Sequence, residues 1–291
     1  MCSLMQIERY PPWIITGPPH TLEDEEYLIQ LFKTSPKCSC FGADDTLVSS
    51  LSNTQPFPRL AIGAQPIINP QTWLTKLYSK QSFRAQIHRA LNKKVAVTQV
   101  NSDTLTNMTE LNTCLAEWIA HKHMPPMAFL LDAHLHNLEK KRVWRVTLDT
   151  KPIGYMIIAP EPRVKGWTIQ HLIRGHLAPN GTSELMIYEC VRILALEGVT
   201  RVNLGMVPLS QHTQHLDQNP FLIRWLMRWM KAHANRFYHF KGLESFREKL
   251  HPDHWETVWL ITSQKSFSCE SGLTLAKAFN IPASSPFSPS Q

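Results

Sequence analysis

The chain of 291 residues has a formal net charge of +7, with 43% hydrophobic and 18% charged residues. This composition excludes an intrinsically disordered chain and allows one large domain or two smaller ones, each with its own hydrophobic core. The surplus of positive charge predicts an anionic partner such as nucleic acid, an acidic membrane or a phosphorylated cofactor.

The six cysteines give little sign of a metal site. Cys38 and Cys40 are the one close pair, and a single C-x-C pair is a poor zinc signature, so we expect no metal and reduced cysteines. The first residues lack the basic start and apolar run of a signal peptide, and no uncharged apolar stretch has the ~18 residues of a transmembrane helix. We expect a cytoplasmic protein and leave open a peripheral position at the inner face of the membrane.

The first half mixes helices and strands. Acidic residues open a predicted helix over 22–32, and 46–66 is predicted to be rich in strands, ending in a buried strand and a turn. Residues 71–94 fit a helix with a basic face. This face fits an ordinary solvated surface and a phosphate-contacting surface equally well. Another helix is predicted over 105–121, before a Pro-Pro break that suggests a boundary between two halves.

The second half is more regular. It predicts a hairpin over 142–161, a strand over 166–175, a helix over 178–199, a short strand over 201–209, a helix over 221–237 and a last strand at WETVWLI. Asn180 or Thr182 can cap the helix over 178–199, Glu184 suits its dipole, and Gly198 ends it.

This order of elements is typical of the GNAT acyltransferase core. Antiparallel strands lead into a strand–helix–strand unit, and in that fold the strands separate before the central helix, where the acyl donor lies. The helix start at APNGT also offers backbone N–H groups to an anion.

Four blocks resemble the C-terminal catalytic domain of phosphatidylglycerol lysyltransferases, the multiple peptide resistance factors. They are HLIRGHLAPNGTSELMIYE, GVTRVNLGMVPLS, NRFYHFKGLESFREKLHP and WETVWLI, and AIGAQPIINPQTW and SFRAQIHRALNKKV add a weaker match in the first half. The resemblance implies an α+β fold of tandem GNAT-like mixed sheets flanked by helices. It divides the chain into a degenerate half (1–122), a catalytic half (123–265) and a disordered tail (266–291).

The same resemblance implies an enzyme that moves an aminoacyl group from aminoacyl-tRNA to a lipid hydroxyl, such as that of phosphatidylglycerol, without a cofactor. Two features depart from the pattern. Full-length members carry a multi-span flippase region ahead of this domain, and we expect this chain to be a stand-alone form. Acetyl-CoA-dependent relatives carry a Q/R-x-x-G-x-G/A loop where this chain reads RGHLAPNG, which favours a tRNA-borne donor.

The resemblance singles out residues around the start of the 178–199 helix. Glu184 can orient the cationic amino group of the donor or act as a base, and a plain helix-dipole carboxylate fits equally. Arg174 can hold a phosphate in a bidentate manner, or be a surface arginine. Asn180 and Gly181 can donate N–H groups to an oxyanion or simply cap the helix, and Asn203 can line the same site or end a strand.

Basic residues concentrate between residues 224 and 249, where seven positive side chains and two glutamates give +5. In the helix over 221–237, Trp225 and Trp229 are four residues apart, as are Arg224 and Arg228. This pattern fits a helix at an anionic bilayer, and also a core helix with extended arginines, which we favour.

The block NRFYHFKGLESFREKLHP supplies the other predicted site residues. Extended alternation would place His239 and Lys241 on one face and Tyr238 on the other, with Gly242 allowing a bend. We expect Lys241 to contact donor phosphate and His239 to relay a proton, although a structural histidine also fits. A basic track is expected to consist of Arg236, Arg247 and Lys249.

Two other functions remain open: an acetyl-CoA-dependent N-acetyltransferase, and a non-catalytic module that binds anionic lipid or RNA. The sequence does not specify the amino acid carried, the acceptor or the oligomeric state.

Overall fold

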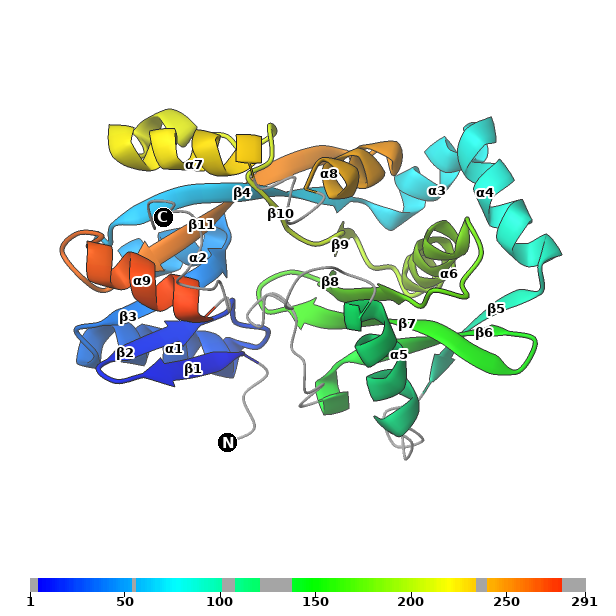
Figure 1. Cartoon of the computed structure of the whole chain (residues 1–291), viewed down its shortest axis with the longest axis horizontal. Coiled ribbons are helices and arrows are strands. Elements are labelled where there is room, and N and C mark those ends of the chain that lie inside the picture. The colour runs from blue at the N-terminus through cyan, green and yellow to red at the C-terminus, as the bar shows by residue number, and fades with distance from the viewer. Residues whose placement is uncertain (1–4, 54–55, 101–107, 121–137, 234–239, 279–291) are drawn as a thin grey trace, which may run out of the picture.

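The computed structural model describes residues 5–53, 56–100, 108–120, 138–233 and 240–278, and in them the strands form one mixed sheet (Figure 1). The strand order is β1-β2-β3-β11-β4-β9-β8-β7-β6-β5, with β10 beside β4. The strands are β1 (Ile7–Tyr10), β2 (Trp13–Thr16), β3 (Cys38–Ala43), β4 (Arg59–Ile68), β5 (Val95–Val100), β6 (Arg142–Leu148), β7 (Lys151–Glu161), β8 (Gly166–Arg174), β9 (Arg201–Asn203), β10 (Val207–Pro208) and β11 (His254–Thr262). The predicted α+β class with a large mixed sheet is confirmed.

The helices are α1 (Leu22–Thr34), α2 (Asp45–Ser52), α3 (Pro70–Tyr78), α4 (Gln81–Asn92), α5 (Met108–Ala120), α6 (Thr182–Leu196), α7 (Phe221–His233), α8 (Phe240–Lys249) and α9 (Cys269–Ala278). Residues of α3, α4 and α6 pack with Trp144, Met156 and Ile158 in the largest apolar core. A second core joins α5 to Tyr155, Ile157 and Ile173. Neighbouring residues of a strand face opposite sides of the sheet, so α5 and α6 cover opposite faces.

The sheet is continuous across the expected boundary near residue 122. The last strand, β11, pairs antiparallel with β3 and with β4. In return β5, from the first part of the chain, pairs with β6. The division into halves at 1–122 and 123–265 stays a prediction. In the structure, each segment contributes a strand to the part of the sheet that the other segment forms.

Most predicted elements of the second half are confirmed, because their local signals agree with their packing. The hairpin over 142–161 is the antiparallel pair β6 and β7. Helix α6 ends where Gly198 adopts a positive φ of 69°, as its C-terminal glycine predicted.

Three expectations for the first half and the tail differ from the structure. Residues 45–52, within the segment expected to be rich in strands, form helix α2, because the Asp44 side chain accepts the N–H of Leu47 (2.7 Å) and caps it. The helix over 71–94 is divided into α3 and α4. The tail that was expected to be disordered contains α9, which Glu270 fixes by accepting hydrogen bonds from Trp13 Nε1 and Lys37 Nζ.

Candidate functional site

Strands β8 and β9 separate at the centre of the sheet. They run parallel and pair from Gly166 with Arg201 to Thr168 with Asn203. Beyond this point β8 continues along β7, whereas the chain after Asn203 follows β4, where the Leu204 N–H donates to the Pro66 carbonyl (2.9 Å). The predicted separation of strands before the central helix is therefore present between β8 and β9.

Asn203 and Arg247, both predicted site residues, each lie near Gly205 beside this separation. The Asn203 side chain is buried, and its Oδ1 accepts the N–H of Gly205 (2.9 Å). Gly205 has φ of 95°, and a Cβ there would lie 3.0 Å from the Ile169 carbonyl oxygen and 3.3 Å from Arg247 Nη2. A glycine thus lets the guanidinium from α8 reach the backbone where the strands part.

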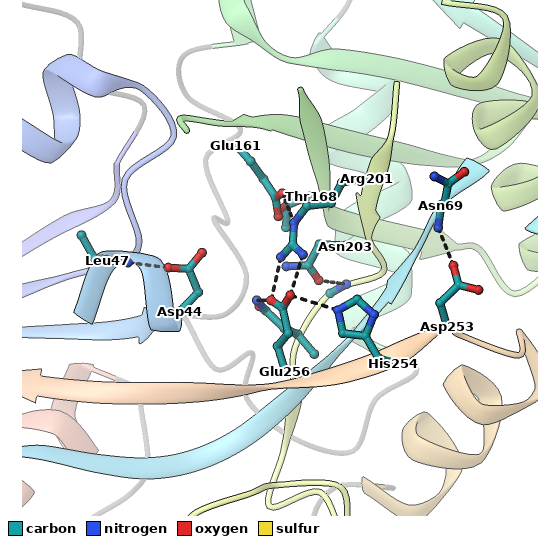
Figure 2. Close-up of polar contacts among 12 residues, drawn as sticks. Asp44, Leu47, Asn69, Glu161, Thr168, Arg201, Asn203, Asp253, His254 and Glu256 are labelled. Atoms are coloured by element: carbon teal, nitrogen blue, oxygen red, sulfur yellow. Dashed lines mark hydrogen bonds and ion pairs between the residues drawn. The ribbon is translucent and has the colours of Figure 1, made fainter. Parts of the chain in front are cut away.

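A second polar cluster has Arg201 at its centre (Figure 2). Arg201 Nε donates to Glu161 Oε2 (2.6 Å), and Nη1 and Nη2 donate to the two oxygens of Glu256 (2.6 and 2.7 Å). The Thr168 hydroxyl donates to Glu161 Oε1 (2.9 Å), and Gln65 Nε2 donates to Glu256 Oε2 (3.3 Å). Five strands of the sheet, β4, β7, β8, β9 and β11, each supply one of these side chains.

The Arg201 cluster has an excess of negative charge. Asp44, at the start of α2, interacts electrostatically with Glu161, Arg201 and Glu256. Three carboxylates and one guanidinium give a net charge of −2 when all are ionised and His254, which lies 3.2 Å from Glu256 Oε1, is neutral. Burial raises the pKa of Asp44; the Leu47 N–H opposes this shift, and the carboxylates of Glu161 and Glu256 increase it. A cation placed here would therefore be stabilised.

Glu256 is held as a carboxylate. Burial acts to raise its pKa, but the hydrogen bonds and charge of Arg201 outweigh burial, so the pKa of Glu256 is lowered. The same two carboxylates raise the pKa of Arg201 above its usual value although burial opposes the shift. The pair is thus ionised throughout the physiological pH range.

The residues predicted around α6 form a separate group. Arg174 and Asn180 are exposed, and Glu184 is half-buried in the first turn. The N-cap is Gly181, without a side-chain hydrogen bond, so the expected cap by Asn180 or Thr182 is wrong. The Thr182 hydroxyl instead donates to the Pro179 carbonyl (2.7 Å).

The start of α6 is covered by α4. Gly181 has φ of 94°, and a Cβ there would lie 2.0 Å from the carbonyl oxygen of Gln86. The backbone of α4 therefore lies directly against the N-cap. This contact explains the glycine by packing, and its expected role as an anion donor stays a prediction.

The two groups of predicted residues are far apart. Arg174 lies six residues along β8 from Thr168, which is beside Asn203, and at ~3.3 Å per residue this separation is roughly 20 Å. The structure therefore brings Asn203 and Arg247 together, and it brings Arg174, Asn180, Gly181 and Glu184 together elsewhere.

The block over 235–252 is helical over Phe240–Lys249, so the extended alternation expected for it is wrong at residues 240–242. Lys241, Gly242 and Lys249 are exposed on α8, while Arg247 is 6% exposed. Residues two apart on a helix point about 200° apart, so Arg247 and Lys249 do not form one track. The remaining predicted residues, Arg236, Tyr238 and His239, lie outside the described residues.

Sequence reasoning missed the Arg201 cluster. Glu161, Arg201 and Glu256 each belong to a strand with buried neighbours. A lone charge in such a strand is a signal of a paired or functional group. Arg201 and Glu256 even lie inside quoted blocks, GVTRVNLGMVPLS and WETVWLI.

Comparison with known protein families shows the family of this chain. The family model of the phosphatidylglycerol lysyltransferase C-terminal region matches residues 25–262. The chain belongs to this family. It therefore has a domain of the lysylphosphatidylglycerol synthetase type, which is a transferase domain.

Solved structures agree with this assignment at the level of the fold. The C-terminal domain of a protein described as a lysylphosphatidylglycerol synthetase from Agrobacterium fabrum is 20% identical, with a TM-score of 0.68 over 96% of this chain and 87% of that one. L-PGS from Bacillus licheniformis is 16% identical, with a TM-score of 0.67 over 97% and 88%. A conserved protein from Bacteroides thetaiotaomicron has 14% identity and a TM-score of 0.54 over 86% and 79%. A search of curated proteins found no match.

Two further observations concern this lysyltransferase-family domain. Among its described residues, no group of three or more His, Cys, Asp or Glu side chains is arranged to hold a metal ion. The part of the chain that the structure describes contains no helix of the length and hydropathy needed to cross a membrane.

Proposed function

We propose that the protein transfers an aminoacyl group from aminoacyl-tRNA to a hydroxyl acceptor, with the hydroxyl of a lipid such as phosphatidylglycerol as the first candidate. The observation that carries the proposal is the family match over residues 25–262. No cofactor is required, because the ester that joins an amino acid to tRNA is already activated. The protein must hold donor and acceptor in reach of each other and stabilise the charge that develops.

The negative Arg201 cluster suits the amino group of the donor. An aminoacyl ester carries at least one ammonium group, and a lysyl ester carries two. The two carboxylates bonded to Arg201, with Asp44 nearby, attract such a cation, and a cation would offset the charges of Glu161 and Glu256 that, together with burial, raise the pKa of Asp44. In this proposal Asp44, Glu161 and Glu256 orient the donor, a role that sequence reasoning gave to Glu184.

Arg247 suits the anionic part of the reaction. Its guanidinium lies beside Gly205, where β8 and β9 part, and it is 6% exposed, so a charge that approaches it is poorly screened by water. We assign to it a phosphate of the donor or of the lipid headgroup. Lys241, Lys249 and Arg174 are exposed and remain candidates for contacts with tRNA phosphates.

Coenzyme A is a poorer donor for this chain. A diphosphate at the start of α6 would use its backbone N–H groups, but the carbonyl of Gln86 lies against Gly181 there. This contact supports the tRNA-borne donor.

The test is transfer of radiolabel from mixed aminoacyl-tRNA to vesicles that contain phosphatidylglycerol, followed by extraction of lipid. We expect label in the lipid fraction, and at least a tenfold loss of rate for Glu161→Gln and for Arg247→Met. Glu189→Gln is the matched control, because Glu189 forms an exposed pair with Arg192. Circular dichroism verifies that each variant is folded. Label that stays on tRNA or passes to water in the wild type would refute the proposal.

A further inference from the structure

Helix α7 presents large apolar side chains to solvent. Phe221, Leu222 and Trp225 are 74%, 70% and 54% exposed. The stripe of which Trp225 is part was expected to be core, and for the described residues this expectation is wrong. Figure 1 shows α7 at the upper rim of the molecule, on the outer side of β4.

The orientation of α7 is fixed by its opposite side. Met227 is buried, and its Sδ accepts a hydrogen bond from Asn219 Nδ2 (3.4 Å). Asn219 in turn bonds both the N–H and the carbonyl of Ala61 on β4 (2.9 and 2.8 Å). This attachment to the sheet holds Met227 inward and therefore leaves Trp225 facing outward.

Basic side chains border the apolar stripe. At about 100° per residue, Phe221, Trp225 and Leu222 span one side of the helix, and Arg228 lies next to Phe221 and Trp225. Arg228 is exposed, and Arg224 and Lys231, half-buried, follow on the same border. The described side chains of α7 include no acidic group. The surface is thus apolar at its centre and positive along one margin.

We propose that α7 docks this protein on an anionic phospholipid surface, with its axis in the plane of the membrane. A helix of this kind buries its apolar side ~5–10 Å into the headgroup boundary while lysine and arginine meet anionic lipid. The exposed apolar stripe favours a bilayer over RNA, and the positive margin of α7 with the net charge of +7 favours an acidic surface over a second copy of this chain. The inference rests on the proposed function and deepens it by naming the surface that brings the chain to its lipid acceptor.

The test is co-sedimentation of the full chain with vesicles of phosphatidylglycerol and phosphatidylcholine, compared with vesicles of phosphatidylcholine alone. We expect the wild type to sediment with the anionic vesicles, and Leu222→Glu/Trp225→Glu to lose at least tenfold in affinity. Leu196→Glu is the matched control, because Leu196 is 79% exposed on α6 and should leave binding unchanged. Arg228→Glu should weaken binding to anionic vesicles and reduce its dependence on salt.

Three results would overturn the docking proposal. One is unchanged sedimentation of the Leu222→Glu/Trp225→Glu variant. Another is equal binding to both kinds of vesicle. The third is a wild type that fails to bind vesicles and elutes as a dimer in size-exclusion chromatography, whereas the variant elutes as a monomer. This result would mean that a second copy of the chain covers α7.

A parallel assay separates the docking proposal from the proposed function. With phosphatidylglycerol dispersed in detergent, the Leu222→Glu/Trp225→Glu variant should transfer label at the wild-type rate, whereas with vesicles it should be slow. Absence of transfer in both forms, with vesicle binding intact, would refute the transferase activity and support the docking. If the Leu222→Glu/Trp225→Glu variant transfers label at the wild-type rate to lipid in detergent and in vesicles, and binds vesicles as the wild type does, the transferase activity is supported and the docking proposal is refuted.

Discussion

At the scale of single residues, Arg201 has the most demanding surroundings. It joins two carboxylates from β7 and β11, and its side chain is 19% exposed. Arg201→Met would leave Glu161 and Glu256 facing each other without their cation, so we expect a loss of about 2–3 kcal/mol in the free energy of unfolding. Arg192→Met, which breaks an exposed i,i+3 pair, should cost less than about 0.5 kcal/mol.

Urea denaturation of both variants measures these losses. Adding Glu256→Gln to Arg201→Met removes one of the two facing charges, so the double variant should be more stable than the sum of the single losses predicts. Strictly additive losses would show that Arg201 and Glu256 are not coupled in solution.

His20 should make stability depend on pH. Its Nε2 lies 2.7 Å from Gln170 Nε2. Burial, followed by the charge of Lys141, lowers the pKa of His20 to about 4 from 6.5. The unfolded chain therefore binds the extra proton first. The stabilisation is complete above about pH 6.5 and declines as the pH falls toward 4, with a loss of about 2 kcal/mol between pH 7 and pH 5.

Urea titrations at the two pH values test this dependence. His20→Gln keeps an acceptor for Gln170 and removes the titrating ring, so most of the difference between pH 7 and pH 5 should vanish. His88→Gln is the control, because His88 is exposed on α4. A pH dependence that survives in His20→Gln would assign it to other groups.

At the scale of elements, the junction of α4 and α6 depends on one glycine. Gly181→Ala adds a methyl group 2.0 Å from the backbone of Gln86 at a positive φ, so we expect a loss of about 2–4 kcal/mol. Gly198→Ala, at φ of 69° with Lys165 Nζ at 3.5 Å as its nearest contact, should cost about 1 kcal/mol. Thermal denaturation measures the loss of stability for both variants. Equal losses would mean that α4 moves away from the added methyl group at little cost.

The elements that sequence predicted have local causes. The β6–β7 hairpin is two largely apolar strands joined by a turn at Asp149 and Thr150, and Gly198 marks the end of α6. Helix α2 was missed because its run TLVSSL contains two β-branched residues and two serines, which are weak helix formers, and the Asp44 cap is a single side chain. The break of 71–94 into α3 and α4 occurs at Ser79 and Lys80, which no glycine or proline announces.

The site was predicted in part for the same reason. Asn203 is recognisable from its strand–helix–strand context and Arg247 from the family resemblance. The Arg201 cluster depends on β11 lying beside β4, a pairing between segments 191 residues apart at Gln65 and Glu256. No local pattern encodes such a contact.

At the scale of the whole molecule, the exchange of strands predicts one cooperative unit. A fragment of residues 1–122 lacks β11, so β3 and β4 lose their common partner, and 123–291 lacks β5 and the strands that flank β11. We expect each fragment alone to lack a cooperative thermal transition, and co-expression to restore it. Circular dichroism and amide exchange measure this; a fragment that folds alone would show that the two parts are independent.

The place of β11 also has a consequence for synthesis of the chain. The ribosome makes β3 and β4 more than 180 residues before the strand that joins them. During that interval both strands have an edge with unpaired backbone N–H and C=O groups. Such an edge can pair with a strand of another chain and so promotes aggregation. Rapid translation and chaperone supply should therefore affect the yield of this protein more than that of a protein whose neighbouring strands are consecutive.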